Sequence, residues 1–174
     1  MARTSVIWSV ILLLTAATVR SEESLRIVPF SDGNRVFVSF ELNDAYDDAV
    51  RDAIASGLRT TFTYELELRT RAWVDRTIGT TVVAMTDRYD NLARRHTLTR
   101  TVDGRVDDVL ITEDDTVVKA WLTKWSHVPV ANTADLDATR DYYVRVTTHT
   151  QPVGRSLLGL PKTITAQVRF TFIP

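Results

Sequence analysis

The clearest pattern in the chain is a strict alternation of side-chain type between residues 58 and 69. One set of positions holds Leu58, Thr60, Phe62, Tyr64, Leu66 and Leu68, and the positions between them hold threonine and charged residues. Successive side chains of a β-strand point to opposite faces of a sheet, so this spacing predicts a strand with one buried and one wet face. Such strands are typical of antiparallel sheets, and the length of this one favours a central position.

Comparable patterns predict further strands at residues 35–42, 81–89, 95–102, 105–111, 142–150 and 163–172. Asp103-Gly104 is typical of a two-residue type I′ hairpin, in which Arg100 would face Asp107. We expect connections around Trp73 and Gly79, a loop at 128–138, which contains Pro129, and a connection at 151–161, which contains Gly and Pro.

Two segments change to the spacing of an amphipathic helix. The first is predicted to begin at an Asn43 N-cap and to end at Gly57, because glycine suits the left-handed conformation that often follows a helix. The second follows Thr112-Glu113-Asp114-Asp115, which resembles a capping box. We expect this second helix to lay Trp121 and Trp125 against the sheet.

The order of these elements is a strand, a helix, four strands, a helix and two strands. This order predicts an α+β fold rich in β-structure, with a curved or sandwich-like antiparallel sheet of about seven to eight strands and two short helices. Residues 22–174 have the length of one domain, which can bury about two-thirds of its unfolded surface.

The N-terminal segment has the organisation of an export signal. Arg3 precedes the uncharged residues 4–19, whose apolar centre is short for a bilayer span of about 20 residues. We predict a signal peptide over residues 1–21, cleaved after Ala17 or Ser21, and a periplasmic or otherwise extracytoplasmic location. The alternative is an uncleaved anchor formed by residues 4–19.

Composition narrows the class of protein. The chain contains no cysteine, so an exported form has no lipobox cysteine and no disulfide, and it depends on its core for stability. The formal net charge of −1 gives no overall reason to expect nucleic acid as a partner.

Residues 48–58, the alternating strand at 61–68, and the following Arg69, Arg71 and Trp73 form a distinctive combination. This combination resembles an uncharacterised bacterial exported family, the domain of unknown function four-three-nine-zero, and the likeness extends over roughly residues 25–172. Many relatives have two adjacent tryptophans where this chain has only Trp73, and the C-terminal part is less similar. The resemblance implies a fold and an envelope location, and it carries no known activity.

No arrangement of residues matches a catalytic, metal or cofactor signature. The histidines His96, His127 and His149 lack the short intervals typical of metal sites. The sequence also contains no Gly-x-Ser-x-Gly elbow and no glycine-rich phosphate loop. We therefore predict a protein that is not an enzyme and has no metal or cofactor.

Two sets of residues are candidates for binding. Nine arginines and no lysine lie between residues 59 and 105. If some of them share the wet face of one sheet, that face would suit an anionic ligand or an acidic partner segment, although interspersed acids favour a simply solvated face. The arginines concerned are Arg59, Arg69, Arg71, Arg88 and Arg95. The aromatic residues Trp73, Trp121 and Trp125 are candidates for an apolar pocket or for the core.

These observations favour a non-enzymatic envelope module that binds an envelope or membrane protein through a sheet face or edge. The alternative is a carrier of a lipid or another amphiphile. Such a ligand would lie between the sheet and the helix with Trp121 and Trp125, beside the apolar loop Leu157-Leu158-Gly159-Leu160. The sequence predicts no particular oligomeric state.

Overall fold

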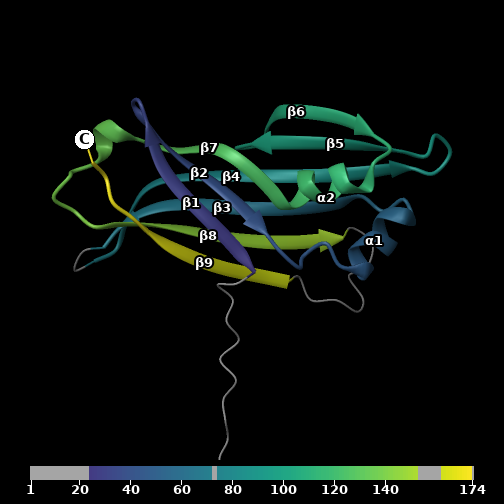
Figure 1. The fold of residues 1–174 in the computed structure, drawn as a ribbon, viewed down its shortest axis with the longest axis horizontal. Coiled ribbons are helices and arrows are strands. Elements are labelled where there is room, and N and C mark those ends of the chain that lie inside the picture. Colours follow the sequence, from purple (N-terminus) through teal and green to yellow (C-terminus); the bar gives the residue numbers. More distant parts are fainter. Residues whose placement is uncertain (1–23, 72–73, 153–161, 174) are drawn as a thin grey trace, which may run out of the picture.

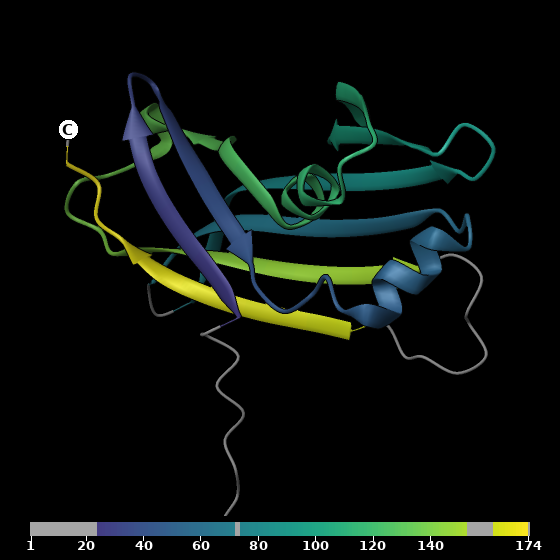
Figure 2. The same ribbon diagram turned by 45° about the vertical axis from the view of Figure 1, so that its right-hand side comes forward.

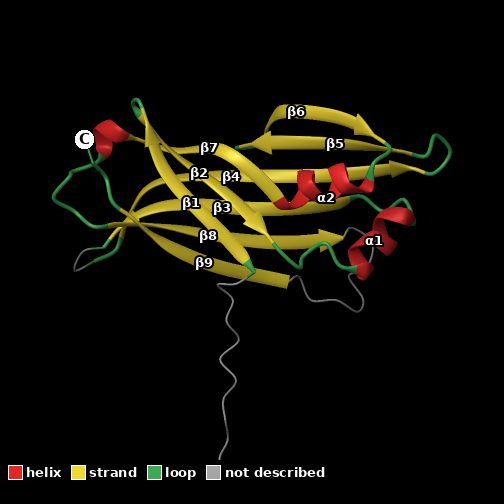
Figure 3. Cartoon of the chain, viewed as in Figure 1, coloured by secondary structure: helices red, strands yellow, loops and turns green. Residues whose placement is uncertain are grey.

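The computed structural model describes residues 24–71, 74–152 and 162–173, which form two antiparallel β-sheets and two α-helices (Figures 1 and 3). The described residues contain six strands in one sheet and three in the other. The fold is therefore the predicted β-rich antiparallel α+β class, with nine strands instead of seven to eight. The predicted signal segment, Trp73 and residues 153–161, which include the apolar leucine loop, lie outside the described residues.

The larger sheet places its strands in an order that differs from their order in the chain. Its members are β3 (Thr60–Thr70), β4 (Arg76–Asp90), β5 (Arg95–Val102), β6 (Arg105–Thr112), β8 (Tyr142–Pro152) and β9 (Lys162–Phe170). The spatial order is β6-β5-β4-β3-β8-β9. β3 pairs with β4 on one side and with β8 on the other along its whole length, which confirms its predicted central position.

The smaller sheet crosses one face of the larger sheet (Figures 1 and 2) and consists of β1 (Leu25–Asp32), β2 (Arg35–Leu42) and β7 (Lys124–Asn132). β2 has the predicted bounds, and β1 was not predicted. The predicted loop at 128–138 is wrong in its first part, because β7 runs to Asn132 and the short 3₁₀ helix η2 (Thr133–Asp135) follows. Pro129 fits this strand because β7 is an edge strand of its sheet, where a missing N–H is tolerated.

The hydrophobic core lies between the two sheets. The even-numbered residues of both β2 and β3 are buried there. The rings of Phe40 and Tyr64 have centroids 4.5 Å apart, and the Tyr64 hydroxyl donates to the Leu122 carbonyl at 2.8 Å. The alternation in the sequence thus corresponds to an inner face that meets the small sheet and an outer face that meets solvent.

Gly79 lies inside β4, which begins at Arg76, and not in a connection as predicted. A Cβ at this position would lie 2.2 Å from the carbonyl oxygen of Val130 in β7. Two residues further on, the Thr81 hydroxyl donates to the Pro129 carbonyl at 2.7 Å. The missing side chain therefore allows β7 to cross β4 closely, which is a tertiary requirement that glycine meets.

Both helices form, but each begins later than predicted. The first, α1 (Asp48–Ala55), is capped by Asp47 and not by Asn43, and the Asp47 carboxylate accepts from the Val50 N–H at 3.0 Å. Asp44, between the two, has a φ of 61°, which is outside the helical range. Gly57 has a φ of 79° after the last turn and donates to the Ile54 carbonyl at 2.8 Å, which confirms its predicted role.

The second helix, α2 (Asp115–Thr123), is capped by Asp114, whose side chain accepts from the Thr116 N–H at 2.7 Å. The expected capping role of Thr112 and the expected place of Trp125 in this helix are therefore wrong. Trp125 is the second residue of β7, since the chain turns into the strand directly after Thr123. Neither helix in the described part of the chain has the length and apolar character needed to cross a membrane.

The hairpin between β5 and β6 has the predicted turn and a different register. Asp103 and Gly104 have φ values of 48° and 77°, and two positive values are required by a type I′ turn. Arg100 lies opposite Asp108 and not Asp107, because the register shifts between Arg100 and Thr101. One additional residue in β6 causes this shift, and the sequence pattern does not reveal such a bulge.

Candidate functional site

The five arginines predicted to share a face lie at two ends of the larger sheet. Arg69 and Arg71 lie at the end of β3, whereas Arg59, Arg88 and Arg95 lie near its start and on the paired parts of β4 and β5. The ten steps along β3 between these ends amount to roughly 33 Å at 3.3 Å per residue. The structure therefore divides the five arginines into two groups, and it adds Arg145 and Arg169 from the C-terminal strands to the group of Arg69 and Arg71.

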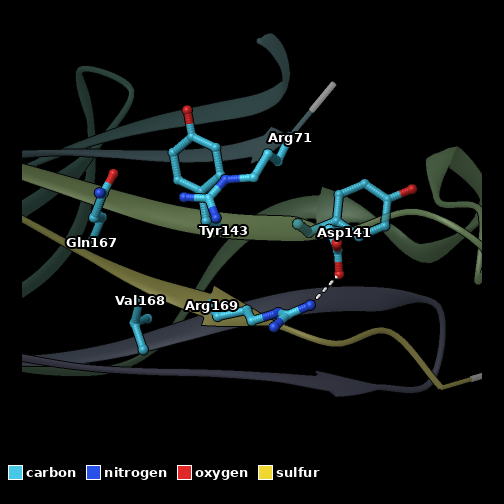
Figure 4. A pocket seen from close by; sticks show the side chains of 7 residues that line it. Arg71, Asp141, Tyr143, Gln167, Val168 and Arg169 are labelled. Carbon is cyan, nitrogen blue, oxygen red and sulfur yellow. Dashed lines mark hydrogen bonds and ion pairs between the residues drawn. The ribbon is translucent and has the colours of Figure 1, made fainter. Parts of the chain in front are cut away.

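Four arginines lie near Tyr143 in β8, three of them in strands and the fourth, Arg71, directly after β3. Arg69 in β3 and Arg169 in β9 are its direct cross-strand neighbours. The guanidinium carbons of Arg71 and Arg145 each lie 6.0 Å from the Tyr143 ring centroid. We call these five residues, Arg69, Arg71, Tyr143, Arg145 and Arg169, the arginine–tyrosine cluster; Figure 4 shows Arg71 over the ring and Arg169 extended toward Asp141.

Carboxylates engage three of the four guanidinium groups. Glu67 lies 3.3 Å from a terminal nitrogen of Arg69 and 3.5 Å from one of Arg145. Arg169 donates to Asp141 at 2.6 Å, and this bond raises the pKa of the Arg169 guanidinium (Figure 4).

Arg71 differs from the other members of the cluster. Among the described residues, it has no carboxylate within 4.0 Å. Its N–H groups are therefore available to an external acceptor.

The backbone fixes the position of Arg71. Its main-chain N–H donates to the Asp141 carbonyl at 2.9 Å, and the Thr70 hydroxyl donates to the same oxygen at 3.3 Å. The Tyr143 ring is held in turn by its hydroxyl, which donates to Asp75 at 2.7 Å. These bonds tie the end of β3 to the start of β8, so the Arg71 guanidinium lies over a fixed aromatic surface.

A pocket of about 210 Å³ lies beside the cluster, lined by Arg71, Tyr143 and Arg169 together with Asp141, Tyr142, Gln167 and Val168 (Figure 4). The lining combines cationic, amide, carboxylate and aromatic groups. Such a set can bind an oxyanion and orient the groups attached to it. Sequence reasoning missed Tyr143, Arg145 and Arg169, because the pairing of β8 with β3 joins segments more than 70 residues apart. The only local signal was the two-residue interval between Tyr143 and Arg145, which puts both on one face of a strand.

Two of the three tryptophans proposed for an apolar pocket or for the core, Trp121 and Trp125, pack in the core and flank a cation. The Arg100 guanidinium carbon lies 4.0 Å from the Trp121 ring centroid and 5.0 Å from that of Trp125. Arg100 also donates to the carbonyls of Trp121 at 3.3 Å and Lys124 at 2.8 Å. Burial lowers the pKa of this guanidinium. The space between the two rings is therefore occupied, and Trp73 lies outside the described residues.

A buried acid–imidazole pair lies on the inner face near the start of α2. His96 Nδ1 is 2.9 Å from the fully buried Asp87, and its Nε2 is 3.5 Å from Asp115. Burial raises the pKa of Asp87, and the hydrogen bond from His96 opposes that rise. The arrangement attaches the first residue of α2 to the sheet.

The other two histidines have different surroundings. The His149 ring nitrogen lies 3.1 Å from the Thr163 hydroxyl, and the His127 ring packs edge-on against Phe30 with centroids 5.0 Å apart. Within the described ranges, no group of three or more His, Asp or Glu side chains could hold a metal ion.

Comparison with known proteins places the chain in a family without assigning an activity. No curated protein and no solved structure matches it. A family model described as a domain of unknown function, DUF4390, matches residues 23–154. This range includes β1 to β8, and with them Arg69, Arg71, Tyr143 and Arg145, whereas Arg169 lies beyond it. Because the match covers most of the chain, the protein belongs to the DUF4390 family.

Proposed function

We propose that this chain is a non-enzymatic module, exported to the cell envelope, that binds an envelope or membrane protein through the arginine–tyrosine cluster. The pattern of residues 1–21 supports export, and the family resemblance supports an envelope location. The observation that carries the binding role is the Arg71 guanidinium, which lies over Tyr143 without a carboxylate partner in the described part of the chain. An arginine of this kind is a typical centre of a protein interface.

The position of the cluster suits recognition of another protein. Arg69, Tyr143, Arg145 and Arg169 lie in β3, β8 and β9, which are hydrogen-bonded neighbours in one sheet, so the sheet sets their spacing. Arg71 directly follows β3, and the hydrogen bond from its main-chain N–H to the Asp141 carbonyl holds it beside them. Tyr143 is 7% exposed, and the guanidinium groups of Arg71 and Arg145 lie over its ring, whereas Arg169 and Asp141 are open to solvent. A rigid base with an accessible polar rim resembles the anatomy of protein interfaces.

The alternative function, transport of a lipid or other amphiphile, has less support. The pocket beside the cluster measures about 210 Å³ and a second, near Phe40 and Lys124, about 150 Å³. Both are smaller than the roughly 300–1,000 Å³ typical of small-molecule sites. Native mass spectrometry of protein purified from its host tests this alternative directly: a co-purifying amphiphile in equal amount would favour the carrier.

Site-specific crosslinking tests the binding role. A photo-reactive amino acid at Gln167, inside the pocket lining, should give a stoichiometric adduct with one envelope or membrane protein in living cells. The same amino acid at Thr97, exposed on the same sheet face at β5, serves as the matched control and should give none. Recovery of only free monomer from the Gln167 position would contradict the proposal.

A separate measurement tests export. N-terminal sequencing of the native protein, combined with fractionation, should find a chain that begins after Ala17 or Ser21 outside the cytoplasm. A chain that keeps its N-terminus and stays in the cytoplasm would contradict an envelope role.

A further inference from the structure

We infer that the arginine–tyrosine cluster binds a carboxylate of an acidic peptide segment, and that Arg71 is the residue that contacts this carboxylate. The inference rests on the proposed function, since it names the chemistry of the partner at the same site. It follows from three features of the cluster: the free donors of Arg71, the fixed ring beneath it and the mixed charge around it.

The guanidinium of Arg71 has the donors that a carboxylate requires. A guanidinium presents parallel N–H groups that match the two oxygens of a carboxylate. In the other three arginines Glu67 or Asp141 already takes up part of this capacity. Arg71 has no such partner among the described residues, so an incoming carboxylate displaces water and no internal ion pair.

The structure also reduces the entropy cost of binding at this position. The Arg71 backbone is bonded to Asp141, and its guanidinium lies over a ring fixed by the bond between Tyr143 and Asp75. A side chain that is already restricted loses less conformational freedom when a ligand binds. This preorganisation distinguishes Arg71 from Arg88, which is also exposed but makes no ring or ion-pair contact within the described ranges.

The charges around Arg71 favour a peptide over an anionic membrane surface. Three acids beside the cluster, Glu67, Asp75 and Asp141, offset three of the four arginine charges, so little net charge is left to attract a continuous layer of negative headgroups. A peptide presents one carboxylate at a time and carries amide groups beside it. Gln167 and Asp141 line the same pocket and can form hydrogen bonds with such amides. The Gln167 amide both donates and accepts, and the Asp141 carboxylate accepts.

Side-chain NMR of the full chain provides the test. The probe is a blocked pentapeptide of alternating glutamate and alanine, and its glutamine counterpart is the matched control ligand. We expect the Arg71 Nε–Hε signal to shift with the glutamate peptide and not with the glutamine peptide. Inorganic phosphate and vesicles containing phosphatidylglycerol form two further arms, and neither should shift this signal as strongly at equal anion concentration.

Variants of the full chain make the test quantitative. Arg71→Ala should weaken binding of the glutamate peptide roughly tenfold, as expected for the loss of a charge-assisted pair of hydrogen bonds. Arg71→Lys keeps the charge and should recover only part of the affinity. Arg88→Ala changes the net charge equally at the other end of the sheet and should leave binding unchanged. If Arg88→Ala weakens binding as much as Arg71→Ala, attraction is non-specific and the inference is wrong.

Two outcomes separate this inference from the proposed function. If Arg71→Ala still gives the Gln167 adduct at full yield, the module binds its partner by other contacts, and the carboxylate assignment fails alone. If the peptide binds at Arg71 but no adduct forms in cells, the anion chemistry is correct and the proposed partnership is wrong. Equal responses of Arg71 to phosphate or to vesicles would also overturn the peptide assignment.

Discussion

The two faces of the larger sheet each place an arginine against aromatic rings, with opposite consequences. On the inner face, Arg100 lies between Trp121 and Trp125, and its donors reach two backbone carbonyls at the end of α2. On the outer face, Arg71 lies over Tyr143, and among the described residues no carboxylate approaches it. An arginine over an aromatic ring therefore stabilises the fold on the inner face and is available for binding on the outer face.

The difference between the two sites lies in where the N–H donors of the guanidinium point. Arg100 satisfies carbonyl groups that the helix leaves without partners at its C-terminal end, so its removal exposes a defect inside the protein. Arg71 is exposed and makes no ion pair among the described residues, so its removal breaks no ion pair there. A guanidinium over an aromatic ring therefore does not by itself indicate a binding site. The partners of its N–H groups must be identified as well.

The largest effect is expected for Arg100→Ala. This change leaves the carbonyls of Trp121 and Lys124 without their donor and opens a gap between the two rings, at a cost of about 2–3 kcal/mol in the free energy of unfolding. Urea denaturation followed by tryptophan fluorescence measures it. Arg100→Lys is the control. Its free energy of unfolding should lie between those of the wild-type protein and Arg100→Ala, because a lysine ammonium cannot fill the planar space between the two rings. A loss of stability below about 0.5 kcal/mol in Arg100→Ala would mean that Arg100 does not serve the fold.

A smaller effect with a defined pH range is expected for Tyr46, whose phenol packs against the core. Burial, followed by the charges of Asp115 and Asp87, raises the pKa of Tyr46 from 10.0 to about 12. The folded protein therefore holds this proton more tightly than the unfolded chain. Its contribution to stability is complete below pH 10 and is lost as the pH rises towards 12.

Tyr46→Phe should remove this loss of stability. A shift of this size corresponds to at most about 2.7 kcal/mol, and solvent screening of the partly exposed ring reduces it to about 1 kcal/mol. Thermal unfolding of the wild-type protein and the variant between pH 9 and 12 measures how steeply stability falls with pH. An unchanged slope in the variant would show that other groups, such as the buried Tyr64, account for the alkaline loss.

Tyr143→Phe sharpens the comparison on the outer face, because it keeps the ring and removes the bond to Asp75. We expect a loss of about 0.5–1 kcal/mol in stability, which is the net value of one hydrogen bond. Chemical denaturation gives this value, and the peptide titration gives the affinity. Binding should fall by less than it does in Arg71→Ala, and the reverse order would mean that the hydroxyl and not the guanidinium contacts the ligand.

The smallest effect on stability is expected for Arg71→Ala. The side chain is exposed and makes no ion pair in the described part of the chain, so the free energy of unfolding should change by no more than about 0.5 kcal/mol. The same denaturation measurement as for Arg100→Ala gives a direct contrast between the two faces. A loss equal to that of Arg100→Ala would mean that both arginines serve the fold.

Local signals in the sequence predicted the elements that depend on local chemistry. The alternation in β2 and β3, the glycine after α1 and the Asp103-Gly104 turn are all confirmed, because strand pleat, helix end and type I′ turn are determined by a few neighbouring residues. Of the candidate binding residues, Arg69 and Arg71 lie in the cluster for the same reason. Arg69 continues the alternation of β3, and Arg71 comes one residue after the strand ends.

The remaining features depended on contacts between distant segments. Pro129 lies in a strand because β7 is at an edge, and Gly79 lies in β4 because β7 crosses there. The cluster around Tyr143 exists because β8 pairs with β3 and β9 pairs with β8. The sequence alone therefore determined the period, the turns and the class of the fold. The tertiary structure decided that the N–H groups of Arg100 bind carbonyls of the fold and that those of Arg71 meet no carboxylate among the described residues. The partners of each arginine depend on neighbouring strands, which no local pattern specifies.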